Sequence, residues 1–392
     1  MKGSTIVDRG IRRGLAIVGV MALAGCQIVP DTRGPAGPTE PVVSRPAPEP
    51  SATALPSGDT TRHRVALLVP LSGGNAAVGQ SIANATTMAL LDTNADNLRI
   101  TTYDTATGPR SAASRAINDG NTLILGPLLA DNVPAVLAES RAANVPLISF
   151  SNDTTVASPD AFVMGHVPEE SIAATVRFAS ARGNSNFAAL VPDGEYGRRA
   201  EAALQAAVRA NGGRVVATER FARGNTSIVS AAERIRQRGG YDSVLVADGA
   251  RLTARAADVF KPGDAQLLGT ELLSGESSVT RTPAMRGMLF SAVPDGRFKR
   301  FADSYNSRFG GQPYRISTLG YDAVLLALRV AQDWRVGDRF PTRALRDKGG
   351  FLGLDGIFRF DRSGVVQRAM EVREIRDGRV VIVGNAPERF ED

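Results

Sequence analysis

The sequence predicts an α/β fold built from two doubly wound, Rossmann-like lobes, each a parallel sheet with helices on both faces. Strand and helix patterns alternate along nearly the whole chain after Arg62, and about 330 residues follow that point, enough for two domains of ordinary size. The same alternation begins again after Phe162–Met164, as if a second sheet were wound in the same way. This repetition indicates the fold class and is common to many families of α/β proteins.

A complete βαβ unit is predicted in residues 121–153. A short apolar run, typical of a strand covered on both faces, precedes a helix and a second apolar run, with a turn residue at each junction. Asp131 or Asn132 is expected to cap the helix, and Asn144 to end it. The loop that leaves the second run carries hydroxyls and a carboxylate at the sheet edge where open α/β sheets bind ligands.

The other elements follow in order. The first lobe is predicted to hold about four parallel strands, and the elements outside the βαβ unit are strands 65–69 and 98–103 and helices 81–92 and 110–118. The second lobe is predicted to hold helices 168–181, 195–210, 227–238 and 251–260 and strands 187–191, 214–219, 243–246 and 266–268. A helix over 316–333 is expected to return to the first lobe, and the tail to form a meander of strands 356–360, 367–375 and 379–383.

The chain is expected to begin with a targeting signal. Four basic side chains precede the apolar run Leu15–Leu23, which has the length of a signal peptide and is too short to span a membrane. Leu23-Ala24-Gly25-Cys26 resembles the lipobox of bacterial lipoproteins, in which cleavage leaves the cysteine as the lipid-modified N-terminus. Cys26 is the only cysteine in the chain. An ordinary secretory signal with an incidental cysteine is the alternative. In Gram-negative lipoproteins, a residue such as Gln27 at the next position implies sorting to the outer membrane.

A proline-rich linker is predicted to follow. Residues 27–61 contain eight prolines and almost no periodic apolar residues, so the segment cannot build a core. At roughly 3.1 Å per residue, such a linker could hold the folded part up to about 100 Å from a lipid anchor. The predicted division is therefore a signal peptide over 1–25, a lipidated cysteine and linker over 26–61, a first lobe over 62–164 completed by about 296–335, and a second lobe over 165–295 completed by about 336–385.

The charge and the residue types argue against nucleic-acid binding and catalysis. Half of the net charge of +6 lies in the predicted signal, and the arginines of residues 234–238 are expected to be a solvated helix end. The two histidines, His63 at the end of the linker and His166, have no partner at metal-ligand spacing, and His166 is expected to be packed or capping. Leu71–Gly74 lacks the Walker lysine and the three-glycine dinucleotide motif. No enzymatic activity, metal or cofactor is expected.

Ligand-binding residues are expected at the carboxyl ends of the strands of both lobes. The candidates are Ser72, Gly73, Gly126, Pro127, Ala130, Asp131, Ser149, Ser151, Asp153, Asp193, Tyr196, Asp248 and Glu271. For Asp131, Asp153 and Asp193, helix capping or turn formation is an equally weighted alternative.

The chain resembles the type I periplasmic binding proteins, the family of the leucine-binding proteins, over nearly all of residues 62–384. The resemblance is carried by VALLVPLSGGNAAVGQS at 65–81, ILGPLLADNVPAV at 124–136, VPLISFSND at 145–153, VPDGEYGRRA at 191–200 and GIFRFDRSGVVQRAMEVREIRDGR at 356–379. With a lipobox and a linker, the chain looks most similar to the lipoprotein activators of penicillin-binding proteins. Substrate-binding components of ABC importers for branched-chain amino acids have similar folds.

The resemblance also implies roles for individual residues. In the amino-acid-binding relatives, a serine and a threonine of the first lobe bind the ligand carboxylate, and an acidic residue of the second lobe binds its ammonium group. Here the serine falls at Ala130 and the threonine at Asn152 or Asp153, whereas Tyr196 matches the family's aromatic residue and Glu271 its acidic residue. An unpaired aspartate would repel a ligand carboxylate.

These implications favour a non-enzymatic outer-membrane lipoprotein in the periplasm that activates a penicillin-binding protein in peptidoglycan synthesis. The alternative is a substrate-binding lipoprotein of an ABC importer, whose partner would be a permease and whose ligand would be a branched-chain amino acid or a related small solute.

Overall fold

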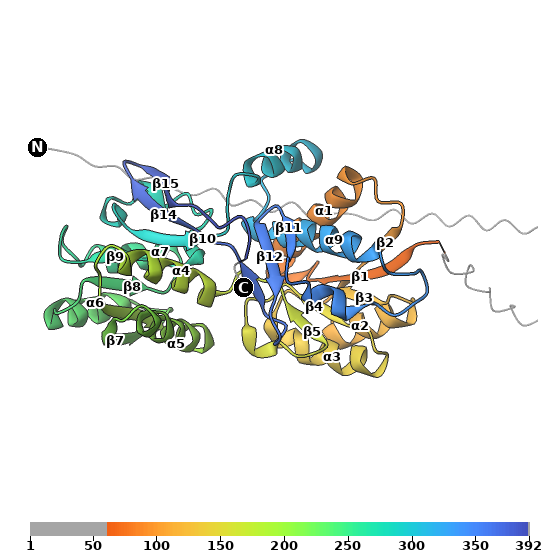
Figure 1. Cartoon of the computed structure of the whole chain (residues 1–392), viewed down its shortest axis with the longest axis horizontal. Helices are drawn as coiled ribbons and strands as arrows, with labels where there is room; N and C mark the ends of the chain where they lie inside the picture. Colours follow the sequence, from red (N-terminus) through yellow and green to blue (C-terminus); the bar gives the residue numbers. More distant parts are fainter. Residues whose placement is uncertain (1–60, 391–392) are drawn as a thin grey trace, which may run out of the picture. The chain divides into compact units, whose positions relative to one another are not determined.

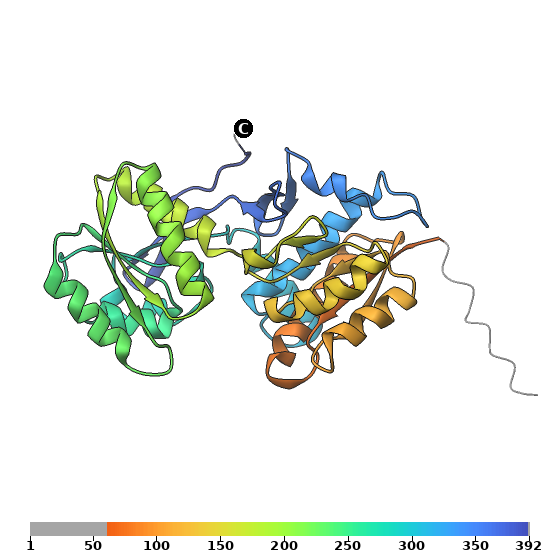
Figure 2. The ribbon, with the colours of Figure 1, turned by 90° about the horizontal axis from the view of Figure 1, so that it is seen from below.

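The structure, a computed structural model, describes residues 61–390. The predicted signal peptide, Cys26 and the linker up to residue 60 lie outside the described residues. Two large sheets and one small sheet form the described part of the chain, with helices on both faces of each large sheet (Figures 1 and 2). Within residues 61–390, no helix combines the length and the apolar character needed to cross a membrane.

The first sheet has five parallel strands in the order β2-β1-β3-β4-β5. The strands are β1 (His63–Val69), β2 (Leu98–Asp104), β3 (Leu123–Leu125), β4 (Leu147–Ser149) and β5 (Ala161–Val163). Helices α1 (Ala76–Asp92) and α9 (Thr318–Ala331) pack on one face, and α2 (Pro109–Asn118) and α3 (Val133–Ala142) on the other. Helix α8 (Phe298–Phe309) packs on α1. β1, β3, β4 and β5 are almost entirely buried, as their apolar runs predicted.

The second sheet has seven strands in the order β15-β14-β10-β9-β8-β6-β7. Five are parallel, namely β6 (Asn186–Pro192), β7 (Arg214–Phe221), β8 (Ser243–Val246), β9 (Gln266–Leu268) and β10 (Leu289–Ala292). The antiparallel pair β14 (Glu371–Arg376) and β15 (Arg379–Gly384) extends the sheet beyond β10. Helices α4 (Pro168–Ser180) and α5 (Glu195–Ala210) cover one face, and α6 (Ser227–Arg238) and α7 (Ala250–Ala257) the other.

The tail does not form the single meander that the sequence predicted. The stretch expected to be one strand over 367–375 is interrupted at residues 369–370, and its two halves belong to different sheets. The first half, β13 (Val366–Arg368), pairs with β12 (Gly356–Phe360), which pairs with β11 (Phe351–Gly353) in a third sheet. The second half is β14.

The third sheet belongs to the core of the first sheet. Phe351, Phe358 and Phe360 lie in the same buried cluster as β1, β3 and α9, and Val163 at the end of β5 bridges to Val365. Residues 336–385 were expected to complete the second lobe, but only β14 and β15 extend the second sheet. Helix α9 packs on the first sheet, as predicted for 316–333.

The starts of helices α3 and α1 differ from those predicted, and three elements were not predicted. Neither Asp131 nor Asn132 caps α3 with its side chain; a short 3-10 turn, Ala130–Asn132, leads into the helix, and the Val133 N–H bonds to the Ala130 carbonyl. Helix α1 begins at Ala76 instead of Ser81. No element was predicted where β10, α8 and β11 lie.

The two histidines lie inside the fold. His63, which was expected at the end of the linker, is the first residue of β1 and stacks on Trp334 with ring centroids 3.9 Å apart. Its burial lowers its pKa.

Candidate functional site

In the first lobe, the candidate residues after β4 bind one another. The Ser149 hydroxyl donates to the Pro127 carbonyl at 2.9 Å and accepts from the Ser151 N–H at 3.1 Å. The Ser151 hydroxyl accepts from the Asp153 N–H at 3.0 Å, and Asp153 Oδ1 accepts from the Thr155 N–H at 2.9 Å. Turn formation, the alternative reading of Asp153, therefore occurs in the structure.

The candidate residues in the loops after β1 and β3 fix the backbone conformation of these loops. Ser72 donates to Asp104 Oδ2 at 2.8 Å, and the Leu71 N–H donates to Oδ1 of the same carboxylate. The Leu71 N–H in particular lowers the pKa of Asp104, so this carboxylate stays ionised and holds the loop. Gly73 begins the short 3-10 turn after Ser72. Gly126, with φ +102°, is required where it stands, because a Cβ there would lie 2.1 Å from the Leu68 carbonyl oxygen.

In the second lobe, Tyr196, Thr270 and Glu271 form one cluster. The Tyr196 hydroxyl lies 3.0 Å from Thr270 Oγ1 and donates to Glu271 Oε1 at 3.1 Å. Glu271 is only 8% exposed, and its Oε2 is buried without a hydrogen-bond partner among the described residues. Burial raises the pKa of Glu271 to about 7 and that of Tyr196 well above its usual value. The cluster contains a carboxyl group with one free oxygen and a pKa near neutrality.

Asp248 joins this cluster through an arginine. Its Oδ2 accepts from Arg223 at 2.8 Å, and its Oδ1 accepts from the Gly249 N–H. The Arg223 guanidinium also lies 5.4 Å from the centre of the Tyr196 ring. Arg223 therefore contacts two of the predicted ligand residues, Asp248 and Tyr196.

Arg199, like Arg223, contacts a predicted ligand residue but was not itself among those predicted from the sequence. It makes a bidentate ion pair with Glu169, at 2.8 and 2.7 Å, and its third nitrogen lies 3.7 Å from Asp153 Oδ1. Arg199 thus supplies a positively charged partner for Asp153 of the first lobe, which the sequence did not predict. The signal was present, because Arg199 falls on the buried stripe of α5 beside Ala200.

Three candidates stay apart from these clusters. Asp131 and Asp193 are exposed, and their side chains make no hydrogen bond or ion pair within residues 61–390. Ala130 begins the 3-10 turn before α3 and offers only a methyl group.

Comparison with known proteins decides the family. The model of the periplasmic binding protein family matches residues 63–379, most of the chain. The chain belongs to the periplasmic binding protein family. This membership implies a location in the periplasm, and the fold is that of the type I periplasmic binding proteins, as the resemblance predicted.

Solved structures with the same fold come from proteins of more than one role. A protein provisionally described as a branched-chain amino acid ABC transporter of Rhodospirillum rubrum has a TM-score of 0.73 and 20% identity, over 82% of this chain and all of that one. Leucine binding protein LivK of Thermotoga maritima has a TM-score of 0.64 and 19% identity, over 83% of this chain and 98% of its own. Full-length LpoA of Haemophilus influenzae has a TM-score of 0.65 and 20% identity, over 83% of this chain and 59% of its own.

A curated relative adds sequence similarity over a shorter stretch. An uncharacterized protein of Rickettsia prowazekii (strain Madrid E) is 25% identical over 157 residues, which are 38% of this chain and 42% of that protein. The match therefore covers less than half of that relative's length.

In this member of the family, a network of charged side chains links two of the three segments that connect the two large sheets. Those segments are residues 164–167, 293–297 and 369–370. His166 lies 2.8 Å from Asp355, which also accepts from Arg315 at 2.7 Å. Asp295 in the second segment accepts from Arg315, before α9, and lies 2.6 Å from Arg373 on β14.

His166 is therefore packed in a structural network, as the sequence indicated. Its burial lowers its pKa. In the part of the chain that the structure describes, no group of three or more histidine, cysteine or acidic side chains could hold a metal ion.

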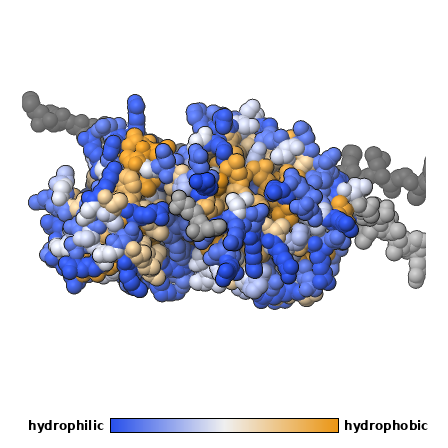
Figure 3. All heavy atoms as spheres, in the orientation of Figure 1, coloured by the Kyte–Doolittle hydropathy of each residue, from blue (hydrophilic) through white to orange (hydrophobic). Residues whose placement is uncertain are grey.

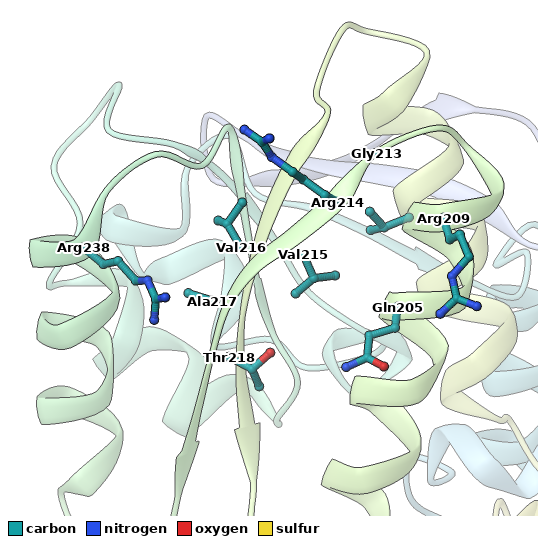
Figure 4. Close-up of a pocket in the computed structure, with 10 residues that line it drawn as sticks. Gln205, Arg209, Gly213, Arg214, Val215, Val216, Ala217, Thr218 and Arg238 are labelled. Atoms are coloured by element: carbon teal, nitrogen blue, oxygen red, sulfur yellow. The ribbon is translucent and has the colours of Figure 1, made fainter.

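Three cavities lie away from the predicted ligand residues. One of about 480 Å³ lies beside β7 and α5, where Arg209, Arg214 and Arg238 surround Val215 (Figure 4). One of about 1210 Å³ lies at the amino ends of β8 and β9, beside Tyr241 and Phe260. One of about 280 Å³ lies beside the end of α9. None of the three is lined by a residue from the predicted ligand set.

Proposed function

We propose that this periplasmic binding protein is a non-enzymatic outer-membrane lipoprotein that activates a penicillin-binding protein in peptidoglycan synthesis. The observation that carries the proposal is the chemistry of the first lobe. Ala130 has no hydroxyl for a ligand carboxylate, and the Asp153 carboxylate already accepts from Thr155 and faces Arg199. A first lobe of this kind is poorly suited to hold the carboxylate of a free α-amino acid.

Two further observations support the same role. LpoA, a penicillin-binding protein activator, shares the fold of this chain. The lipobox at Cys26 and the proline-rich residues after it are the features expected of a folded domain tethered to the outer membrane at a distance. The penicillin-binding protein would then be reached across the periplasm.

The proposal is tested by recovery of partners from membranes. The full chain, with its own signal and an affinity tag at its C-terminus, is cross-linked in cells, solubilised from the outer-membrane fraction and purified. A penicillin-binding protein among the co-purified proteins supports the activator. An importer permease in its place contradicts the activator. An unrelated tagged outer-membrane lipoprotein is the control for non-specific recovery.

A second candidate function is favoured by the Tyr196–Glu271 cluster. An ionised Glu271 with a free, buried Oε2 could accept an ammonium group, the role that the resemblance implies for this position. A substrate-binding lipoprotein of an ABC importer would use this cluster for a ligand with a cationic group. Because the first-lobe carboxylate site is altered, that ligand would differ from leucine, isoleucine and valine.

A further inference from the structure

Strand β15 is an apolar edge of the second sheet. It is last in the strand order, and residues 379–384 read Arg-Val-Val-Ile-Val-Gly. Val380 and Ile382 are 37% and 54% exposed and point to the same side, because side chains alternate along a strand. An apolar patch lies over this part of the second sheet, at the upper left of Figure 3. Exposed edge strands are usually protected by charges or proline, and residues 380–383 contain neither.

The free edge has defined ends. On one side, Asp377 and Gly378 have φ +47° and +73°, the geometry of a two-residue hairpin turn, and Arg376 pairs with Arg379. On the other side, the strand ends at Gly384, and Pro387 lacks the N–H that a longer ladder would need. A pairing partner therefore meets a free edge of six residues.

We propose that a second copy of this chain pairs antiparallel along β15, with Val381 at the two-fold axis. In this register, Val380 of one copy faces Ile382 of the other, and Arg379 faces Val383. No like charges face each other. The two Arg379 side chains lie four residues apart, about 14 Å along the strand, which exceeds the screening length of about 8 Å at physiological salt. The strand is thus complementary to itself in apolar character and charge.

The association is expected to depend on protein concentration. A stable interface buries about 800 Å² on each partner, and a single six-residue edge offers little area. Confinement to a membrane surface would raise the local concentration. The inference does not depend on which partner protein the chain activates.

The first test is sedimentation velocity of the full chain carrying Cys26→Ser, which removes the only cysteine and with it the lipid. A dimer that grows with concentration is expected, and the double variant Val380→Lys/Ile382→Lys should stay monomeric with an unchanged melting temperature. Leu352→Lys, at an equally exposed leucine on β11, is the matched control and should keep the dimer. A monomer at every concentration, or a dimer that survives the double variant, would overturn the proposal.

The second test measures the register. In the same background, Val380→Cys protein is mixed with Ile382→Cys protein and oxidised. Residues directly opposite each other have Cα atoms about 4.5–5.5 Å apart, within the range for a disulfide. The mixture should therefore form a covalent dimer faster than either single variant, whose cysteines are two residues out of register. Equal rates in all three samples would contradict the pairing on Val381.

Discussion

At the scale of single residues, burial controls the chemistry of the Tyr196–Glu271 cluster. Glu271 is ionisable, 8% exposed and bonded through only one oxygen, so the protein stabilises its protonated form. Near pH 7, a carboxyl group of this kind is present in both its protonated and its ionised form, and the ionised form can bind a cation. The two proposed functions differ in which of these states the protein uses.

Glu271→Gln should remove part of the pH dependence of stability. The pKa of Glu271 is raised from 4.5 to about 7, so its contribution is fully present below pH 4.5 and is lost as the pH rises through 7. The loss amounts to about 3 kcal/mol in the free energy of unfolding. The pKa values of Glu170 and Asp322 are also raised to about 7. Both residues remain in the variant, so part of the pH dependence remains as well. Urea denaturation of both proteins from pH 5 to pH 8 measures the free energy of unfolding at each pH. Plots of this free energy against pH that run parallel for the two proteins would contradict the prediction.

Leucine, isoleucine and valine should leave the melting temperature unchanged. A ligand at about 100 times its dissociation constant adds about 2.7 kcal/mol to the folded state, which is on the order of several degrees for a chain of this size. Such binding is not expected, because Ala130 has no hydroxyl for the ligand carboxylate and Asp153 places a carboxylate of its own there. Differential scanning fluorimetry with each amino acid is the measurement. A rise of that size, abolished by Tyr196→Ala or Glu271→Ala, would favour the importer receptor over the activator.

At the scale of elements, the connections between the two large sheets are held by ion pairs. Burial would raise the pKa of Asp355, but Arg315 and His166 hold it well below its usual range. Arg315 is itself almost buried between Asp295 and Asp355. The segments that carry these residues come from distant parts of the chain, so the network joins elements that the sequence order separates.

Asp355→Asn should destabilise the protein strongly. The change keeps the shape of the side chain but leaves Arg315 and Arg368 buried with less opposite charge, which typically costs about 3–5 kcal/mol. Chemical denaturation measures the loss. Asp333→Asn is the matched control, because Asp333 is exposed and its side chain makes no hydrogen bond or ion pair within the described residues. Equal stability of the two variants would show that the network contributes little.

At the scale of the whole molecule, the predicted anchor lies outside the part of the sequence that forms the described core. The core clusters lie within residues 65–375, and Cys26 lies outside the described residues. Changes at the N-terminus should therefore alter location and reach without altering the fold.

Cys26→Ser should release the protein from the membrane fraction without unfolding it. A lipid on this cysteine is the proposed anchor, and the substitution replaces none of the core residues of the described part of the chain. Membrane fractionation and circular dichroism are the two measurements. A Cys26→Ser protein that remains in the outer membrane would remove the lipobox interpretation.

Deletion of residues 30–56 should impair function and leave the melting temperature unchanged. A proline-rich spacer contributes reach and no core. The effect on function is measured by whether the variant rescues a strain that depends on the protein. The effect on stability is measured by thermal denaturation of the purified variant. A glycine-serine spacer of equal length is the control and should restore part of the function. Full function of the deletion would count against a distance-spanning role.

The sequence by itself determined the α/β class, the restart of the pattern after β5 and nearly every helix and strand of the two large sheets. These features follow from the spacing of apolar residues and from turn residues, which act over a few positions. Tyr196 and Glu271 were predicted as ligand residues from a family motif and the end of a strand, and that role stays a prediction, whereas the hydrogen bond between their side chains comes from the structure. The tertiary structure alone decided that β13 and β14 enter different sheets and that Arg199 lies beside Asp153. Both depend on contacts between residues far apart in the chain, where partner and register are chosen by packing and charge rather than by local pattern.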